Sequence, residues 1–169
     1  MNEGVSPNCQ GIIKTTPLCA AATHNHTNIV DLLLSFGADV NFESGQLLSF
    51  SRTPLAVACH YGFLDLAKHL IKKGALVDLR SGVYGNPLHA AIGSNEIEIV
   101  ELLIENGASI ELKAGPYLDT PLCVAAKKNH LAIVKLLILK GAKVKALRKI
   151  QRKTIPSEIL KYLKTEKYL

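Results

Sequence analysis

The sequence predicts an all-α solenoid of stacked helix–turn–helix units, because one pattern recurs four times along the chain. Each copy opens with Pro-Leu, at Pro17, Pro54, Pro87 and Pro121. A Gly-Ala pair follows every opening at the same distance, beginning at Gly37, Gly74, Gly107 and Gly141. Self-similarity at this period is typical of repeat proteins, in which neighbouring units bury one continuous core. The aromatic content of 5% and the absence of Trp favour thin layers of small helices.

A short first helix is predicted at the start of each copy. The residues before the prolines are Thr16, Thr53, Asn86 and Thr120. Their side-chain oxygens can accept a hydrogen bond from a free backbone N–H at a helix start. Proline suits the first helical position, because the N–H that it lacks has no partner there. Small residues follow, as in Cys19-Ala20-Ala21-Ala22, and these allow neighbouring units to approach closely.

A tight turn and a second helix are predicted next. The turns are Asn25-His26, Gly62-Phe63, Asn95-Glu96 and Asn129-His130, and Gly and Asn tolerate a left-handed backbone. Apolar residues then recur with helical spacing, as in Ile133-Val134 and Leu136-Leu137-Ile138. We expect the glycine of each Gly-Ala pair to end this helix, and the alternating tail Ala38-Asp39-Val40-Asn41 to form an extended loop. Carboxylates early in the second helices should favour the helix dipole: Asp31, Asp65 and Glu98.

These four copies resemble the ankyrin repeat, with its T-P-L-H-x-A opening and G-A-D-V-N close. The matching segments are Thr16–Asn41, Thr53–Asp78, Asn86–Glu111 and Thr120–Lys145. Only Pro87-Leu88-His89 keeps the His of the family opening. The resemblance implies an L-shaped stack of helix pairs with β-turn loops, or fingers, that project at right angles. It divides the chain into an N-terminal extension (residues 1–11), four repeats (12–146) and a basic C-terminal capping half-repeat (147–169).

The two ends of the repeat region differ. Ile155-Pro156-Ser157 falls where a fifth opening is expected, and Ile159, Leu160 and Leu163 follow with helical spacing. We expect this segment to close the apolar end of the stack, since terminal repeats usually have a polar outer face. Nothing comparable precedes Ile12. Either the first repeat is its own cap, or the chain is the end of a longer protein.

The positive charge is concentrated in the C-terminal tail. Residues 140–169 contain ten Lys or Arg against Glu158 and Glu166, a net charge of +8 in a chain whose total is +6. The remainder therefore carries a net charge of −2. Three interpretations of the tail are open: a solvated cap, a nuclear address or contact with an acidic partner, and nucleic-acid binding. The last is the least favoured, because no aromatic residues alternate with the charges.

No pattern of catalytic, cofactor-binding or metal-binding residues is present in the sequence. Glycine-rich phosphate loops, a GxSxG elbow and an HExxH pair are all missing. We expect His24 and His26 to be turn residues and not metal ligands. The four cysteines, Cys9, Cys19, Cys59 and Cys123, form no CxxC pair, so we expect reduced thiols in or near the core. No signal peptide or membrane-spanning run is visible, and the expected location is intracellular, in the cytoplasm or the nucleus.

The resemblance also indicates where a partner protein should bind, because ankyrin partners usually meet the concave side formed by fingers and first-helix ends. The residues that map to this surface are Thr15, Thr23, His24, Leu48, Phe50, Arg52, His60, Tyr61, Val83, Tyr84, Ser94, Tyr117, Asp119, Lys127 and Lys128. Tyr61 and Tyr84 are the expected centre, since Tyr often carries interface energy. The long first finger adds Leu47, and its apolar residues either contact the partner or cover the neighbouring layer.

The function predicted from the sequence is therefore binding without catalysis. We expect a monomer that holds another protein as an inhibitor or scaffold, with no small-molecule substrate. Short ankyrin chains of this kind resemble the inhibitors of NF-κB and the cyclin-dependent kinase inhibitors. The alternative is a substrate adaptor of a ubiquitin ligase, because Ile155–Leu163 weakly resembles the end of a SOCS box. The Cys-containing helix of that box has no counterpart in Leu147–Lys153.

Overall fold

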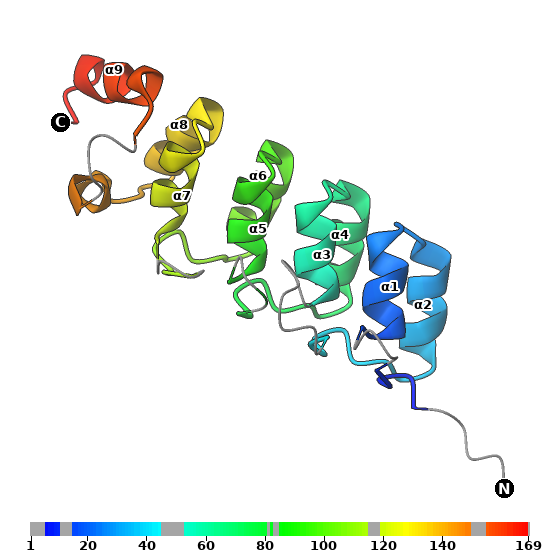
Figure 1. Ribbon diagram of the computed structural model, residues 1–169. Helices are drawn as coiled ribbons and strands as arrows, with labels where there is room; N and C mark the ends of the chain where they lie inside the picture. The colour runs from blue at the N-terminus through cyan, green and yellow to red at the C-terminus, as the bar shows by residue number, and fades with distance from the viewer. Residues whose placement is uncertain are drawn as a thin grey trace, which may run out of the picture.

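A computed structural model describes residues 6–10, 15–44, 53–80, 82, 85–114, 119–149 and 155–168 of the chain. In these ranges the named secondary-structure elements are helices, and an isolated β-bridge pairs Ala114 with Asp119. Four helix pairs stand side by side in a row (Figure 1). The all-α stack predicted from the sequence is confirmed.

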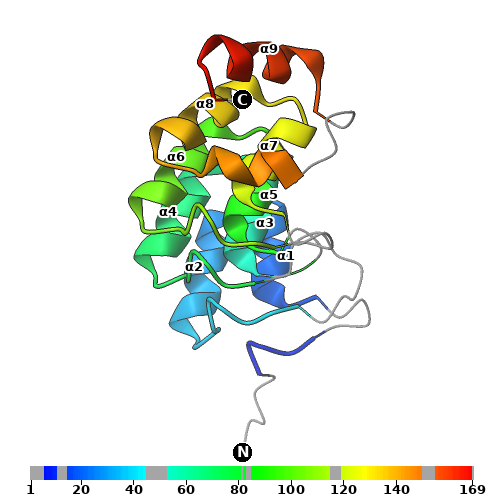
Figure 2. The ribbon, with the colours of Figure 1, turned by 90° about the vertical axis from the view of Figure 1, so that its left-hand side faces the viewer.

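Each pair consists of an inner and an outer helix. The inner helices are α1 (Pro17–Thr23), α3 (Pro54–His60), α5 (Pro87–Gly93) and α7 (Pro121–Lys127). The outer helices are α2 (Thr27–Ser35), α4 (Leu64–Lys72), α6 (Ile97–Glu105) and α8 (Leu131–Leu139). In the view turned by 90° about the vertical axis, the inner helices form one column and the outer helices form a second (Figure 2). The fold is thus two layers of short helices.

The inner helices begin as the openings predict. Each starts at its proline, and the preceding side chain accepts a hydrogen bond from a backbone N–H three residues later. In the first repeat, the N–H of Cys19 donates to Oγ1 of Thr16 over 3.1 Å. In the third, the N–H of His89 donates to Oδ1 of Asn86 over 2.9 Å. Such a cap stabilises a helix by about 1 kcal/mol.

The turns and helix ends also follow the glycine and asparagine pattern. Asn25, Gly62, Asn95 and Asn129 have positive φ angles of 55°, 76°, 65° and 62°. Gly37 has φ +84°, and the N–H of Ala38 donates back to the carbonyl of Leu33, which closes α2. The tails that follow are not simply extended. The N–H of Phe42 donates to the carbonyl of Asp39, so the predicted extended segment contains a turn.

The core lies between the columns and between successive pairs. Inner helices contribute small side chains, and Ala58, Ala90, Ala91 and Ala125 are fully buried. Outer helices contribute larger ones such as Leu70, Leu103 and Leu137, which are also fully buried. Small residues on one layer let the next repeat approach, and large residues on the other fill the space. Truncating one of these leucines to alanine is expected to cost about 2–5 kcal/mol of stability.

Two further helices follow the fourth repeat. A 3-10 helix, η1 (Val144–Lys149), packs against α7, and α9 (Ser157–Thr165) lies next to α8. Nζ of Lys135 on α8 is 5.2 Å from the ring centre of Tyr162 on α9, and Ile159 and Leu163 are fully buried. The repeat pattern did not indicate η1. Together these helices cover the last apolar layer of the stack.

Candidate functional site

The inner helices end in a row of side chains that occupy the same position in successive repeats. The residues at this position are His24, Tyr61, Ser94 and Lys128, the C-caps of α1, α3, α5 and α7. Their backbones share one conformation, with φ angles of −104°, −91°, −100° and −87°. We call this row, with the preceding residues Thr23, His60 and Lys127, the inner-helix edge. The same backbone conformation therefore carries four chemically different side chains in the four repeats.

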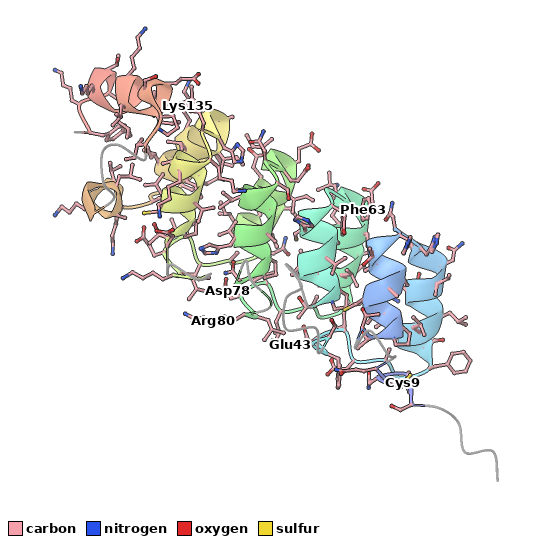
Figure 3. The ribbon with its side chains drawn as sticks, viewed as in Figure 1. Cys9, Glu43, Phe63, Asp78, Arg80 and Lys135 are labelled. Atoms are coloured by element: carbon pink, nitrogen blue, oxygen red, sulfur yellow. The ribbon has the colours of Figure 1, made fainter. Side chains whose placement is uncertain are left out.

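Tyr61 is the exposed aromatic residue of this edge. Its side chain is 51% exposed, although two rings support it. His60 packs edge-on against it at 4.9 Å, and Phe63 stacks on it at 5.8 Å. Phe63 is the N-cap of α4, on the side of the stack where the helix turns lie (Figure 3). The ring of Tyr61 is therefore accessible and held in place, as an anchor for another protein requires.

His60 connects the second repeat to the third. Its Nδ1 atom is 2.9 Å from the hydroxyl oxygen of Ser94. Burial, and then the positive charge of Lys128, lowers the pKa of His60 below its ordinary value. The ring is therefore neutral at pH 7, and the centre of the inner-helix edge is an uncharged aromatic and hydroxyl surface.

At the first repeat the polar groups of the edge bond to their own helix. The hydroxyl of Thr23 donates to the carbonyl of Cys19 over 2.8 Å, and Nδ1 of His24 donates to the carbonyl of Ala20 over 3.0 Å. His24 stacks on His26 with the ring centres 5.8 Å apart. Both histidines lie in the turn between α1 and α2. Across the described ranges, no group of three or more His, Cys, Asp or Glu residues is placed to hold a metal ion.

At the fourth repeat an ion pair runs along α7. Nζ of Lys127, at the end of the helix, is 2.7 Å from Oδ2 of Asp119, which precedes its N-cap. Two predicted contact residues from opposite ends of α7 are therefore brought together.

The other predicted contact residues differ in exposure and coverage. Thr15 is half-buried before the opening of α1, and Lys128 is exposed. The remaining predicted residues lie outside the described part of the chain: Leu47, Leu48, Phe50, Arg52, Val83, Tyr84 and Tyr117.

The finger side carries a regular set of hydrogen bonds that the repeat pattern did not predict. The last residue of each of the first three closing sequences accepts a backbone N–H from the next repeat. Oδ1 of Asn41 accepts from Leu76 over 2.8 Å, and Oε1 of Glu111 accepts from Lys143 over 2.7 Å. Asp78 accepts from Ser109 in the same way. We call these bonds the finger ladder; Glu43, Asp78 and Arg80 lie along this edge (Figure 3). The sequence does contain a signal for these bonds, because a residue with a side-chain oxygen recurs at the position of Asn41, Asp78 and Glu111.

The role expected for Asp31 is wrong. It lies in the middle of α2 and not in the first turn, which contains no acidic residue. Its carboxylate instead contacts His69 and Lys73 on α4, at 2.8 Å and 3.0 Å. Asp65 and Glu98 do lie in the first turns of α4 and α6. Asp31 therefore joins two repeats on the outer-helix face.

The cysteines are free thiols, with Cys19, Cys59 and Cys123 buried and Cys9 half-buried. Burial raises the pKa of Cys19 to about 11. Burial likewise raises the pKa of Cys59 far above its ordinary value. A thiol that stays protonated is a poor nucleophile and a poor metal ligand, so these buried groups are packing residues.

Of the helices described, none is long and apolar enough to cross a membrane.

Several known proteins are similar to this chain over part of their length. A putative ankyrin repeat protein of Rickettsia felis is 42% identical over 82 residues, which cover 48% of this chain and 34% of that protein. Ankyrin repeat and SOCS box protein 11 of Mus musculus is 34% identical over 92 residues, 54% of this chain and 27% of that protein. Palmitoyltransferase AKR1 of Lachancea kluyveri is 34% identical over 80 residues, only 10% of its length. The chain thus spans about a third or less of these relatives.

The family model described as "Ankyrin repeats (3 copies)" matches nearly the whole chain. Its matches cover residues 1–81, 43–114 and 78–148, and overlap so that every helix pair is included. The same four pairs have the capped proline openings, left-handed turns and closing glycines described above. The chain belongs to the ankyrin-repeat family.

Proposed function

We propose that this chain is a non-catalytic protein-interaction module whose partner binds along the inner-helix edge and the neighbouring fingers. One observation carries the proposal: the backbone position of His24, Tyr61, Ser94 and Lys128 is constant, whereas the side chains differ. Side chains that serve the fold recur from repeat to repeat, as the openings and closing glycines do. Side chains that vary on a constant scaffold are free to match a partner.

The chemistry of the edge favours a protein partner over a small molecule. The inner-helix edge extends over four repeats, and its aromatic residue, Tyr61, lies at the second. A half-exposed ring beside the neutral His60 and the hydroxyl of Ser94 offers apolar area and hydrogen bonding together. Interfaces concentrate energy in such anchors and surround them with weaker polar contacts. Thr15, Asp119, Lys127 and Lys128 would supply that polar rim.

The mechanism we propose is occlusion or scaffolding. A row of helix pairs with a continuous core holds its edge rigid, so the partner is bound at little conformational cost to this chain. The bound partner is then either blocked at its own functional surface or held for a third protein. Arg52, Tyr84 and Tyr117, which the sequence predicts as further contact residues, lie outside the described part of the chain and remain part of the proposal.

A ubiquitin-ligase adaptor is the second candidate. The ankyrin and SOCS box relative favours it, although the match covers only 27% of that protein. An adaptor of this kind would bind elongins B and C through its C-terminal segment. Purified full-length chain should then bind the elongin pair, and a chain truncated after Leu147 should not. Failure of the full-length chain to bind would exclude the adaptor and leave the interaction module intact.

Affinity capture tests the interaction module directly. Tagged wild-type chain and Tyr61→Ala are compared as baits, with Lys68→Ala as the matched control, because Lys68 is exposed on the outer helix α4. Proteins bound to wild type should be depleted with Tyr61→Ala and retained with Lys68→Ala. A captured set that is unaffected by Tyr61→Ala but lost with Lys68→Ala would place binding on the outer-helix face and contradict the proposal.

A further inference from the structure

The carboxylate of Glu96 in the third repeat lies against the turn of the second. Its Cδ atom is 2.8 Å, and both of its oxygens are 2.9 Å, from the point that a Cβ atom on Gly62 would occupy. Gly62 lies between Tyr61 and Phe63, whose rings stack with their centres 5.8 Å apart and their planes at 18°. A negative charge is therefore placed beside two aromatic rings.

The fold does not account for an acidic residue at this position. Glu96 is the N-cap of α6, but its side chain makes no capping hydrogen bond. The N-caps of the other outer helices are His26, Phe63 and His130, so the repeat does not require a carboxylate here. Within the described ranges, no basic side chain forms an ion pair with Glu96. Its charge is thus not compensated by any residue in those ranges.

The groups around this carboxylate are accessible to another molecule. Tyr61 is 51% exposed, whereas Phe63 and Glu96 are half-buried. A charge that is partly shielded from water attracts an opposite charge more strongly than a fully exposed one, because the local dielectric constant is lower. His60, which packs edge-on against Tyr61, has a lowered pKa and is neutral at pH 7, so it does not repel a cation.

The charge on the surrounding elements also favours a cation. Helix α6 contains Glu98, Glu101 and Glu105 and no Lys or Arg. Residues 1–139 carry a net charge of −2, since the total is +6 and residues 140–169 carry +8. Lys128 of the fourth repeat opposes this, because its charge reaches His60. Its side chain is exposed, so water and salt screen its effect.

We propose that Tyr61, Phe63 and Glu96 bind an arginine side chain of the partner, which therefore presents a basic segment to the inner-helix edge. A guanidinium group is planar, so it stacks on an aromatic ring and donates two parallel hydrogen bonds to a carboxylate. The ring attracts the same cation through its negative face. This inference rests on the proposed function, because it names the chemistry that the partner brings to that surface.

A peptide titration tests the site without a partner protein. The probe is acetylated and amidated Gly-Gly-Arg-Gly-Gly, and the neutral control peptide has citrulline in place of arginine. NMR spectra of the isotope-labelled full chain follow the amides of Tyr61, Phe63 and Glu96. Glu96→Gln removes the charge with little change in shape, and Tyr61→Leu removes the ring but keeps apolar area. Glu98→Gln is the matched control, because it makes the same charge change at an exposed position in the first turn of α6.

The arginine peptide should give saturable shifts with a dissociation constant of about 1 mM, and the citrulline peptide should bind about tenfold more weakly or less. Glu96→Gln and Tyr61→Leu should each weaken binding about tenfold, whereas Glu98→Gln should not. Absence of saturable shifts, equal binding of the two peptides, or equal losses in Glu96→Gln and Glu98→Gln would overturn the proposal. So would a lower thermal midpoint with unchanged affinity in Glu96→Gln, since the carboxylate would then serve the start of α4.

Affinity capture with Glu96→Gln separates this proposal from the proposed function. Bound proteins should be depleted with both Glu96→Gln and Tyr61→Ala. Depletion with Tyr61→Ala alone would remove the arginine site and leave the interaction module standing. A captured set that Tyr61→Ala leaves unchanged would instead count against the module, even where the arginine peptide binds.

Discussion

Asp31 and His69 lie on successive outer helices, and Oδ1 of Asp31 is 2.8 Å from Nε2 of His69. Nζ of Lys73, one turn further along α4, is 3.0 Å from the same oxygen. The hydrogen bond to Lys73, and then the one to His69, lowers the pKa of the Asp31 carboxyl below its ordinary value. A carboxylate on one repeat therefore binds two basic side chains on the next.

Acid should weaken this connection between the first two repeats. Because folding lowers the pKa of Asp31, its contribution is complete above the unfolded value of about 3.9 and is lost as the pH falls through the folded value. Thermal midpoints measured from neutral pH down to about pH 2 should therefore fall less steeply for Asp31→Asn than for wild type. Identical pH profiles for the two proteins would show that the pair contributes nothing to stability.

Replacing Asn86 with threonine should stabilise the protein. Nδ2 of Asn86 is buried, and no described group accepts its hydrogens. The other three openings have threonine, whose oxygen can accept the capping N–H while its hydroxyl donates to Nδ1 of His89. Burial lowers the pKa of His89, so the neutral ring can use both bonds, with Nε2 donating to the carbonyl of Asp119.

Urea unfolding should show a gain of about 1 kcal/mol for Asn86→Thr, because a buried unsatisfied amide is removed. The reverse change, Thr120→Asn, is the matched control and should lower stability at the equivalent cap. A loss of stability in Asn86→Thr would mean that the amide has a partner and that the cap is already satisfied.

The turn at Gly62 should tolerate asparagine better than alanine. Gly62 has φ +76°, and asparagine has a positive φ at the equivalent turns, Asn25, Asn95 and Asn129. A Cβ at Gly62 would meet the carboxylate of Glu96 at 2.8 Å, but this is the end of a flexible side chain that can move aside. The backbone conformation therefore sets the cost, about 1 kcal/mol for Gly62→Ala and less for Gly62→Asn. Equal urea midpoints for the two variants would contradict this explanation.

The fold was predictable from the sequence because its signals are local. A capping side chain, a proline and a closing glycine act within one helix, so Pro17, Pro54, Pro87 and Pro121 each mark a helix start without reference to the rest of the chain. Contacts between repeats were not predictable in the same way. The pairing of Asp31 with His69 depends on the register of α2 against α4, which only the stacked structure sets.

In the candidate site, too, the backbone positions were predictable from the sequence and the side-chain contacts were not. Repeat position alone predicted that His24, Tyr61, Ser94 and Lys128 would lie at first-helix ends, and the structure places them there as C-caps. The internal bonds of Thr23 and His24 depend on side-chain rotamers, which a repeat alignment does not contain. Binding by any of these residues remains a prediction.

Calorimetric titration of a captured partner against Tyr61→Ala and Lys68→Ala measures the proposed surface most directly. Truncating an interface anchor typically costs ~2 kcal/mol or more, about a thirtyfold loss of affinity, whereas residues outside an interface have little effect. Tyr61→Ala should therefore weaken binding about thirtyfold or more while its melting curve stays close to that of wild type, and Lys68→Ala should bind as wild type does. Unchanged affinity in Tyr61→Ala, together with a large loss in Lys68→Ala, would contradict binding at the inner-helix edge.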